Sequence, residues 1–316
     1  MAGALAGWAV ARLAGADRLR FAEAWAVPLL SFTPQAAAAA WASALLLRGP
    51  GPAAAASLAG VALSATVGSR AIPSSQPAAA GPVLGVLTAN LLVGRAAADE
   101  LVELVCRKRA DVLFVQEFTD TAAANLERAG LGDLLSHRVM QPKAHGRSGS
   151  GIYGRYPLSG GPPARPESAA RCTARLELPS GQSAQLTCIH CPPPKPPWSR
   201  HAAAQWRSHL SALPPPVGSP LILGGDFNAT LDHAQFRRLL QRGYADAASQ
   251  AGNGLTRTWG PRPDLPLTLL AIDHILIDRR CAVLATSAHR LTGTDHRALY
   301  AQLRLPAPTS RTGQAD

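Results

Sequence analysis

The segment from Leu221 to Asn228 constrains the fold of this 316-residue chain more than any other stretch. It reads Leu-Ile-Leu-Gly-Gly-Asp-Phe-Asn, and its short apolar run is typical of a buried strand. The two glycines allow the backbone to pass close to whatever binds there. If the extended conformation continues, Asp226 and Asn228 project from one face at the carboxyl end of the strand. Such a carboxylate and amide can orient a water molecule and a phosphoryl oxygen, although a plain Asx turn after a strand would use the same residues.

Polar residues follow apolar strand candidates at several other places in the chain. They are Asn90, Glu117, His190, Asp226 with Asn228, Asp273, and Asp295 with His296. Any one of them is typical of a turn or a cap, but six strand ends with this set indicate one site at one edge of a scaffold. Helix candidates at 99–109, 200–213 and 233–241 lie between the strands. The mixture predicts a layered α/β fold with two sheets packed together.

These residue types suit the hydrolysis of phosphate esters. Asn90, Glu117 and Asp295 offer the hard oxygen donors that Mg²⁺ prefers. A bound metal would polarise the phosphoryl group and neutralise developing charge. Asp226 would orient or deprotonate the attacking water, and a histidine paired with an aspartate would keep one tautomer and stabilise the transition state.

Six short motifs resemble those of the endonuclease/exonuclease/phosphatase superfamily, which includes deoxyribonucleases and sphingomyelinases. They are Thr88-Ala89-Asn90, Val115-Gln116-Glu117, Ile189-His190, Gly225-Asp226-Phe227-Asn228, Ile272-Asp273-His274-Ile275 and Thr294-Asp295-His296. No single motif is specific, but all six occur in the family's order across residues 83–305. The resemblance implies a four-layered α/β sandwich, two packed mixed sheets flanked by helices, with a Mg²⁺-dependent site in which Mn²⁺ is the alternative ion.

The resemblance also implies roles for individual residues. Glu117 resembles the principal metal ligand, with Asn90 beside it and Asp295 contributing. Asp226 resembles the carboxylate that orients the water. Asn228 resembles the amide that holds both the scissile phosphate and Asp226.

Three histidines are interpreted in the same way. His296 resembles the catalytic histidine, with Asp273 as its partner. His190 stands where enzymes of the deoxyribonuclease and sphingomyelinase types have histidine and apurinic endonucleases have tyrosine, so a role in apurinic repair is disfavoured. We expect His274 to pack or cap, because alternate side chains of a strand face opposite ways.

The amino-terminal part of the chain has almost no charge. Residues 24–47 and residues 52–69 contain no charged side chain, and each run is close to the roughly 20 residues that span a bilayer. We expect residues 1–70 to form a hydrophobic transmembrane helical segment, and the alternative is an alanine-rich helical hairpin packed on a soluble domain. Residues 71–82 read as a linker, and residues 306–316 as a flexible tail after the catalytic domain.

This arrangement looks like the bacterial membrane-attached branch of the superfamily. It implies a location at the bacterial plasma membrane. Arg48 lies between the two uncharged runs, and if it is cytoplasmic, residue 76 onward lies outside. We therefore expect an extracytoplasmic catalytic domain.

Net charge bears on the substrate. Only five of the 31 basic and two of the 20 acidic residues precede residue 76, so the remainder carries a net charge of +8. A basic excess favours nucleic acid or acidic lipid as a partner. A GC-rich genome that prefers Arg over Lys is the alternative explanation of the same charge balance. We expect a nuclease-like phosphodiesterase. The alternatives are a phosphodiesterase or phosphatase acting on lipid headgroups and, third, a non-catalytic membrane-tethered binding protein.

The five cysteines do not form a closed disulfide framework by count. Cys188 and Cys191 make a CxxC pair, but no second pair stands at zinc-finger spacing. Small buried thiols are therefore preferred over a zinc or redox site.

Overall fold

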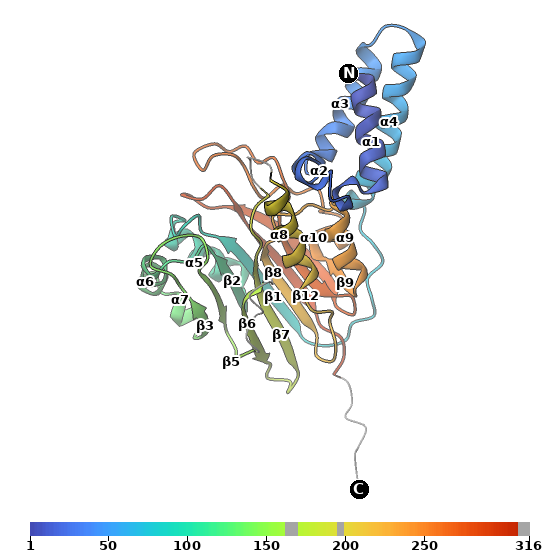
Figure 1. The fold of residues 1–316 in the computed structure, drawn as a ribbon. Coiled ribbons are helices and arrows are strands. Elements are labelled where there is room, and N and C mark those ends of the chain that lie inside the picture. The colour runs from blue at the N-terminus through green and yellow to red at the C-terminus, as the bar shows by residue number, and fades with distance from the viewer. Residues whose placement is uncertain (162–169, 195–198, 309–316) are drawn as a thin grey trace.

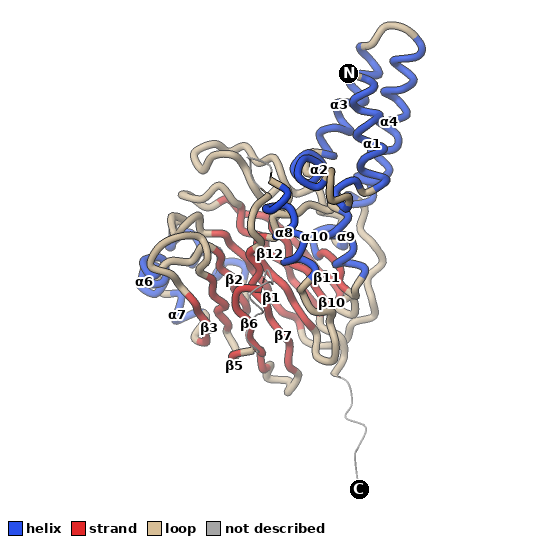
Figure 2. The backbone as a smooth tube through the Cα atoms, viewed as in Figure 1, coloured by secondary structure: helices blue, strands red, loops and turns tan. Residues whose placement is uncertain are grey.

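The computed structural model describes residues 1–161, 170–194 and 199–308 (Figure 1). Two six-stranded sheets pack face to face, and helices lie on their outer sides. Figure 2 shows the strands gathered in the body of the molecule and most of the helices at its margins. Each sheet contains both parallel and antiparallel pairs, so the α/β sandwich expected from the sequence is confirmed.

The first sheet has the strand order β11-β12-β1-β2-β4-β3. Its strands are β1 (Val83–Asn90), β2 (Val112–Gln116), β3 (His137–Gln141), β4 (Ser150–Gly154), β11 (Ala282–Arg290) and β12 (Arg297–Arg304). The central strands β1 and β2 are parallel, and Asn90 pairs with Gln116. Because parallel strands end at the same edge of a sheet, Asn90 and the next residue after β2, Glu117, reach one edge together.

The second sheet has the order β5-β6-β7-β8-β10-β9. Its strands are β5 (Leu158–Gly160), β6 (Ala170–Glu177), β7 (Ser183–His190), β8 (Leu221–Asp226), β9 (Tyr244–Asp246) and β10 (Asp273–Asp278). β7 runs parallel to β8, and His190 pairs with Asp226. β10 runs antiparallel to β8, so that its first residue, Asp273, also pairs with Asp226. The register alone therefore places three predicted site residues side by side.

Three buried layers hold the sandwich together. One lies between the sheets and includes Phe114 and Ile275. The second buries the apolar side of α5 (Ala98–Lys108), where Leu101 and Leu104 face the first sheet as the periodicity predicts. It also takes residues of α6 (Asp120–Arg128) and α7 (Leu131–Leu134). The third packs α8 (Arg200–Ser211) and α9 (Ala234–Gln241) on the second sheet, and the short α10 (Ala247–Gln250) follows β9.

The two glycines of the Leu221–Asn228 segment have a packing role. A Cβ on Gly224 would lie 2.2 Å from the ring of Phe114 in the facing sheet. Gly225 has a φ of 151°, and its Cβ would lie 2.0 Å from the carbonyl oxygen of Ile189. Both therefore allow sheets and strands to approach closely. The close approach expected of these glycines is thus seen within the protein itself, between the two sheets and between β7 and β8.

The amino-terminal helices form a bundle at one end of the sandwich. They are α1 (Ala2–Ala14), α2 (Glu23–Leu30), α3 (Thr33–Leu46) and α4 (Pro50–Gly68). Figure 1 shows α1, α3 and α4 projecting away from the sheets and α2 lying at their base. Within the described residues, the helical stretch Pro50–Ala71 is long and apolar enough to cross a membrane, and α2 with α3 would qualify only as one span bent by 72°. Helices in the cores of soluble proteins and signal sequences meet the same criteria.

A buried ionic cluster joins this bundle to the sandwich. Asp232 is fully buried and accepts bonds from Arg12 Nε at 2.7 Å and from Arg70 Nη1 and Nη2 at 2.8 and 2.5 Å. Asp17 accepts a hydrogen bond from the backbone N–H of Ala234, the first residue of α9, at 2.7 Å. The carboxylate of Asp17 thus lies at a helix amino terminus, where negative charge is favoured.

The segment expected as a linker follows the surface of the sandwich. Residues 72–82 contain no helix or strand, and their backbone and side chains bond to three parts of the domain. Ser74 N–H donates to Gln250 O at 3.1 Å, Gln76 Oε1 accepts from Val283 N–H, and Gly81 N–H donates to Leu305 O. The expected tail falls mostly in residues 309–316, which lie outside the described residues.

Candidate active site

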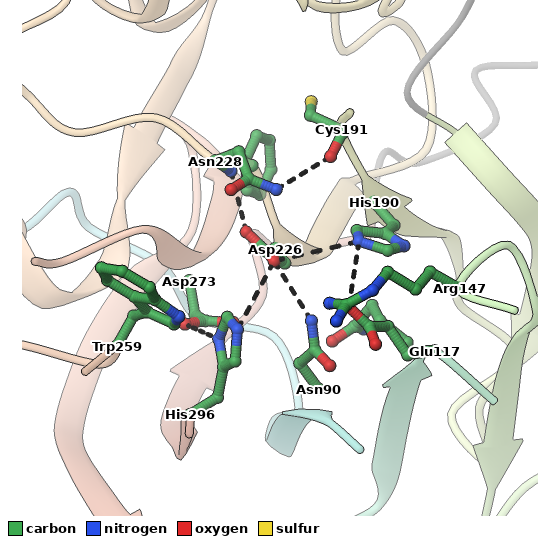
Figure 3. A network of polar contacts seen from close by, with 12 residues as sticks. Asn90, Glu117, Arg147, His190, Cys191, Asp226, Asn228, Trp259, Asp273 and His296 are labelled. Carbon is green, nitrogen blue, oxygen red and sulfur yellow. Dashed lines mark hydrogen bonds and ion pairs between the residues drawn. The ribbon is translucent and has the colours of Figure 1, made fainter. Parts of the chain in front are cut away.

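The predicted site residues gather at one end of the sandwich (Figure 3). A cavity of about 570 Å³ opens there. Six of the eight predicted residues line it: Glu117, His190, Asp226, Asn228, Asp295 and His296. Asn90 and Asp273 complete the set through direct hydrogen bonds to Asp226 and His296. Residues separated by up to 206 positions in the sequence thus form one cluster.

Asp226 lies at the centre of this cluster and is 2% exposed. Its Oδ1 accepts the backbone N–H of Asn228 at 2.8 Å, and its Oδ2 accepts Asn90 Nδ2 at 3.1 Å. The Nε2 atoms of His296 and His190 lie 3.8 and 4.0 Å from Oδ2. Burial, together with the negative charge of Asp273, raises the pKa of Asp226 to about 7, against the opposing effect of His296.

Asn228 does not continue the strand as expected. β8 ends at Asp226, and Asn228 has a left-handed backbone with a φ of 46°. The bond from its N–H to Asp226 Oδ1 closes an Asx turn, the alternative left open by the sequence. Its side chain donates from Nδ2 to Cys191 O at 2.9 Å, and Asn228 still lines the cavity beside Asp226. The Asx turn, rather than a continued strand, therefore places the Asn228 amide in the cavity beside Asp226.

His296 and Asp273 form a buried dyad. His296 Nδ1 lies 2.8 Å from Asp273 Oδ2, and both side chains are almost fully buried. Burial lowers the pKa of His296, but the neighbouring carboxylate of Asp273 outweighs it and raises that pKa to about 9. The dyad therefore favours an imidazolium whose Nε2–H points toward Asp226 and the cavity. A proton donor held in this way can stabilise negative charge on a phosphoryl oxygen.

Glu117 is held in an uncommon backbone conformation beside Arg147 and His190 (Figure 3). It follows β2, is 2% exposed and has a φ of 51°, a left-handed region that is costly outside glycine. Its Oε2 accepts the N–H of Val93 at 2.9 Å. Its Oε1 contacts Arg147 Nη1 at 2.8 Å and lies 3.8 Å from His190 Nε2. The surrounding structure therefore fixes a carboxylate at the cavity wall, with a cationic side chain across it.

The predicted metal ligands fit a hard divalent cation. Asp295 Oδ2 accepts Trp259 Nε1 at 3.1 Å, whereas its Oδ1 is buried and has no hydrogen-bond partner among the described residues. A buried carboxylate oxygen of this kind is costly unless a donor or an ion meets it. Asn90 Oδ1 accepts the N–H of Leu92, and its Nδ2 additionally orients Asp226. Oxygen atoms from Glu117, Asn90 and Asp295 match the preference of Mg²⁺ and Mn²⁺.

A second group of potential ligands lies close by. The ligand atoms of Asp226, Asp273 and His296 are all within 4.8 Å of one another. The hydrogen bond between Asp273 and His296 already joins two of them, and the imidazole nitrogen suits zinc better than magnesium. The chemistry of the donors therefore favours the oxygen set for magnesium and leaves this group for acid–base work.

Two side chains of the site were not predicted. Arg147 lies in the loop before β4, and Trp259 lies between α10 and β10. Both line the cavity, and each binds one of the predicted acidic residues, Glu117 or Asp295. Neither follows an apolar strand, so the pattern that identified the other residues carries no signal for them.

Two minor expectations are resolved by packing. His274 bonds through Nδ1 to Asp246 Oδ2 at 2.7 Å and through Nε2 to Ala229 O at 2.9 Å, so its packing role is confirmed. Cys188 belongs to the core between the sheets, and Cys191 to the layer beneath α8. The CxxC pair is thus split between two buried layers, as expected for packed thiols rather than for a shared metal.

Several solved structures share the fold of this chain. Similar folds include an endonuclease/exonuclease/phosphatase from Beutenbergia cavernae, with 16% identity, TM-score 0.54 and coverage of 71% of this chain and 72% of that one. A humanised D. rerio TDP2 gives 16% identity and TM-score 0.55 over 70% of this chain and 98% of that one. A mannosyl-6-phosphatase of Bacteroides thetaiotaomicron gives 17% identity and TM-score 0.51 over 70% and 99%. No curated protein sequence matches the chain significantly.

These low identities establish a shared fold only. The sequence evidence comes from the model of the Endonuclease/Exonuclease/phosphatase family, which matches residues 87–296. That range runs from within β1 to His296 and contains all eight predicted site residues. The chain therefore belongs to the Endonuclease/Exonuclease/phosphatase family.

Proposed function

We propose that this protein is a membrane-attached phosphoesterase that depends on a divalent metal, Mg²⁺ or Mn²⁺. The observation that carries the proposal is the buried carboxylate of Asp226, held by Asn90 and Asn228 and facing the His296–Asp273 dyad across 3.8 Å. Family membership supports the reaction class. The placement of Glu117 and Asp295 in the same cavity supports the metal.

Each residue has a step that its position allows. Asp226 orients a water molecule and accepts its proton as the water attacks phosphorus. His296, oriented and kept protonated by Asp273, donates from Nε2–H to a phosphoryl oxygen as charge develops. Asn228 and His190 line the same cavity and bind the phosphate. Glu117, Asn90 and Asp295 would hold the cation, which when bound polarises the phosphoryl group.

Hydrolysis of bis(p-nitrophenyl) phosphate tests this proposal. Purified full-length protein in a mild detergent should release p-nitrophenolate with Mg²⁺ and lose that activity with a chelator. Asp226→Asn removes the charge without changing the shape, and it should lower turnover by about 10²–10⁴-fold. An Asp226→Asn variant that retains near wild-type turnover would reject the assignment of Asp226.

Attachment to the membrane by residues 1–70 is the second part of the proposal. It is supported by the stretch Pro50–Ala71 and by the absence of charged residues between Glu23 and Arg70 other than Arg48. Arg48 lies at the tip of the bundle, between α3 and α4, and a cytoplasmic tip would put the sandwich on the extracytoplasmic side. Full-length protein recovered in the soluble fraction without detergent would reject the attachment.

The natural substrate is a narrower question. Net charge favours a nuclease, and lipid headgroup hydrolysis is the alternative. The structural neighbours do not decide between them, since they include a TDP2 described in complex with a single-strand DNA product and a mannosyl-6-phosphatase.

A further inference from the structure

The amino-terminal helical segment builds part of the active-site cavity. Pro28 in α2 and Ser31 and Phe32 in the turn after it line the same cavity as Asp226 and His296. We infer that the substrate is a membrane amphiphile, with its phosphate ester at Asp226 and its apolar chain against Phe32 and Pro28. This inference rests on the phosphoesterase function proposed above and assigns a substrate class to the same site.

The position of α2 beside the cavity is fixed by buried contacts. Val27 is 1% exposed and packs in the layer that contains Ile189 and Trp206. The backbone oxygen of Val27 lies 2.7 Å from His233 Nε2, and Glu23 forms an ion pair with Arg207 at 3.0 Å. The wall is therefore a built part of the site rather than a helix that rests on it.

The cavity is poorly suited to a polyanion. Among the described residues that line it there is one arginine, Arg147, and no lysine, and the guanidinium of Arg147 already contacts Glu117 at 2.8 Å. The cationic His296 is already bonded to Asp273. A nucleic acid bound without base readout needs several phosphate contacts. It also needs exposed rings for stacking, and among the described aromatic residues of the sandwich, after residue 82, only Tyr156 and Trp259 are not buried. Tyr156 packs against the core and Trp259 is bonded to Asp295, so the exposed rings near the site belong to the amino-terminal segment.

Apolar surface continues outward from the cavity. Its wall includes Pro192–Pro194, Leu270 and Ile272 in addition to α2. Leu265 and Leu267, in the same connection as Leu270, are 43% and 49% exposed.

Exposed apolar side chains also lie in the amino-terminal segment. Phe21 and Trp25, beside or within α2, are 69% and 43% exposed. Gln35 Nε2 donates to Leu269 O at 2.7 Å, so the start of α3 and the α10–β10 connection are in contact. Exposed apolar side chains in two segments that are in contact beside the cavity are typical of a membrane contact. With α4 in a bilayer, the mouth of the cavity would face lipid at high effective concentration.

Two chromogenic diesters test the inference. Methyl p-nitrophenyl phosphate and dodecyl p-nitrophenyl phosphate differ only in their apolar chain. In both, water attacks phosphorus, the bond to p-nitrophenolate breaks and an alkyl phosphate remains. Full-length protein with Mg²⁺, in a fixed concentration of nonionic detergent, should show kcat/KM at least about tenfold higher for the dodecyl ester.

Substitutions at Phe32 test whether the dodecyl chain of the ester lies against this side chain. Phe32→Ala should reduce the dodecyl-to-methyl ratio of kcat/KM by about tenfold, and Phe32→Leu, which keeps an apolar wall, should restore most of it. Leu45→Ala is the control, because Leu45 is 86% exposed near the end of α3 that is opposite Phe32 and does not line the cavity. Circular dichroism establishes that each variant is folded.

The outcomes separate this inference from the proposed function. Equal kcat/KM for the two esters, an unchanged ratio in a folded Phe32→Ala protein, or plasmid nicking that outpaces dodecyl ester hydrolysis would overturn the amphiphile and leave the phosphoesterase intact. Absence of hydrolysis of either ester with Mg²⁺ or Mn²⁺ would reject the phosphoesterase itself.

Discussion

Asp232→Asn is expected to destabilise the protein strongly, although Asp232 takes no part in the proposed chemistry. The wild-type carboxylate lies between two guanidinium groups at 2.5 to 2.8 Å, and the side chains of Asp232, Arg12 and Arg70 are 0%, 7% and 7% exposed. Removing its charge leaves two buried cations without a counter-ion. A broken buried pair of this kind costs about 3–5 kcal/mol of the free energy of unfolding.

Urea unfolding of the full-length protein in nonionic detergent measures this loss. Glu127→Gln is the control, because Glu127 pairs with Arg138 at 2.6 Å with both side chains about half exposed, and its loss should cost less than about 1 kcal/mol. Burial raises the pKa of Asp232, but the opposing effect of Arg70 and Arg12 is larger in sum, so the pKa lies below the ordinary value of 3.8. The charged carboxylate of Asp232 therefore stabilises the folded protein above pH 3.8. This stabilisation is lost only as the pH falls through the pKa that Asp232 has in the folded protein.

Replacement of the whole cluster checks the reasoning. If uncompensated charge causes the loss, then Arg12→Met, Arg70→Met and Asp232→Leu together should recover most of it, because apolar side chains of similar volume can replace a buried ionic cluster. A destabilisation below about 1 kcal/mol in Asp232→Asn, or a triple variant that is worse than the single one, would refute this account of the junction.

Three further outcomes follow from the site. Asp273→Asn and His296→Gln should each reduce kcat, and the double variant should lose little more than the worse single variant, because residues that act as a unit are non-additive; additive losses would mean that they act separately. Glu117→Gln should weaken Mg²⁺ binding, measured by titration calorimetry without substrate, and unchanged affinity would remove Glu117 from the ligand set. Arg147→Gln should tighten Mg²⁺ binding in the same assay, because its guanidinium competes for Glu117 Oε1; weaker binding would contradict this.

The central strands could be predicted because they are buried on both faces. Val83–Asn90 and Leu221–Asp226 read as apolar runs, and both are strands at those positions. The edge strand Ala282–Arg290 was missed, since it is half exposed and its polar and small residues do not alternate cleanly. The apolar run that leads into β10 starts at Leu269, but the strand begins only at Asp273, where Thr258 Oγ1 accepts the two backbone N–H groups of Ile272 and Asp273. Thr258 lies earlier in the same α10–β10 connection, so the pattern of the run itself does not show where the strand begins.

The same difference between local pattern and contacts with other segments explains which residues of the site could be predicted. Asp226, His190 and Asp273 could be placed together because strand ends converge, and the register pairs all three. The wall formed by Phe32 could not be predicted, because it depends on how α2 docks on the second sheet through Val27 and His233. Residues 24–47 form an uncharged run in the sequence. That pattern indicates that the segment is compatible with a membrane, but it carries no information about which cavity the segment lines.

Net charge and cavity chemistry answer different questions about the substrate. The positive charge acts at long range and favours any anionic surroundings, including an acidic membrane surface. A bound substrate would touch the cavity lining, which includes one arginine and an apolar wall contributed by the amino-terminal segment. A polyanion explains the first observation alone, whereas a phosphate ester carried by an amphiphile in an acidic membrane explains both.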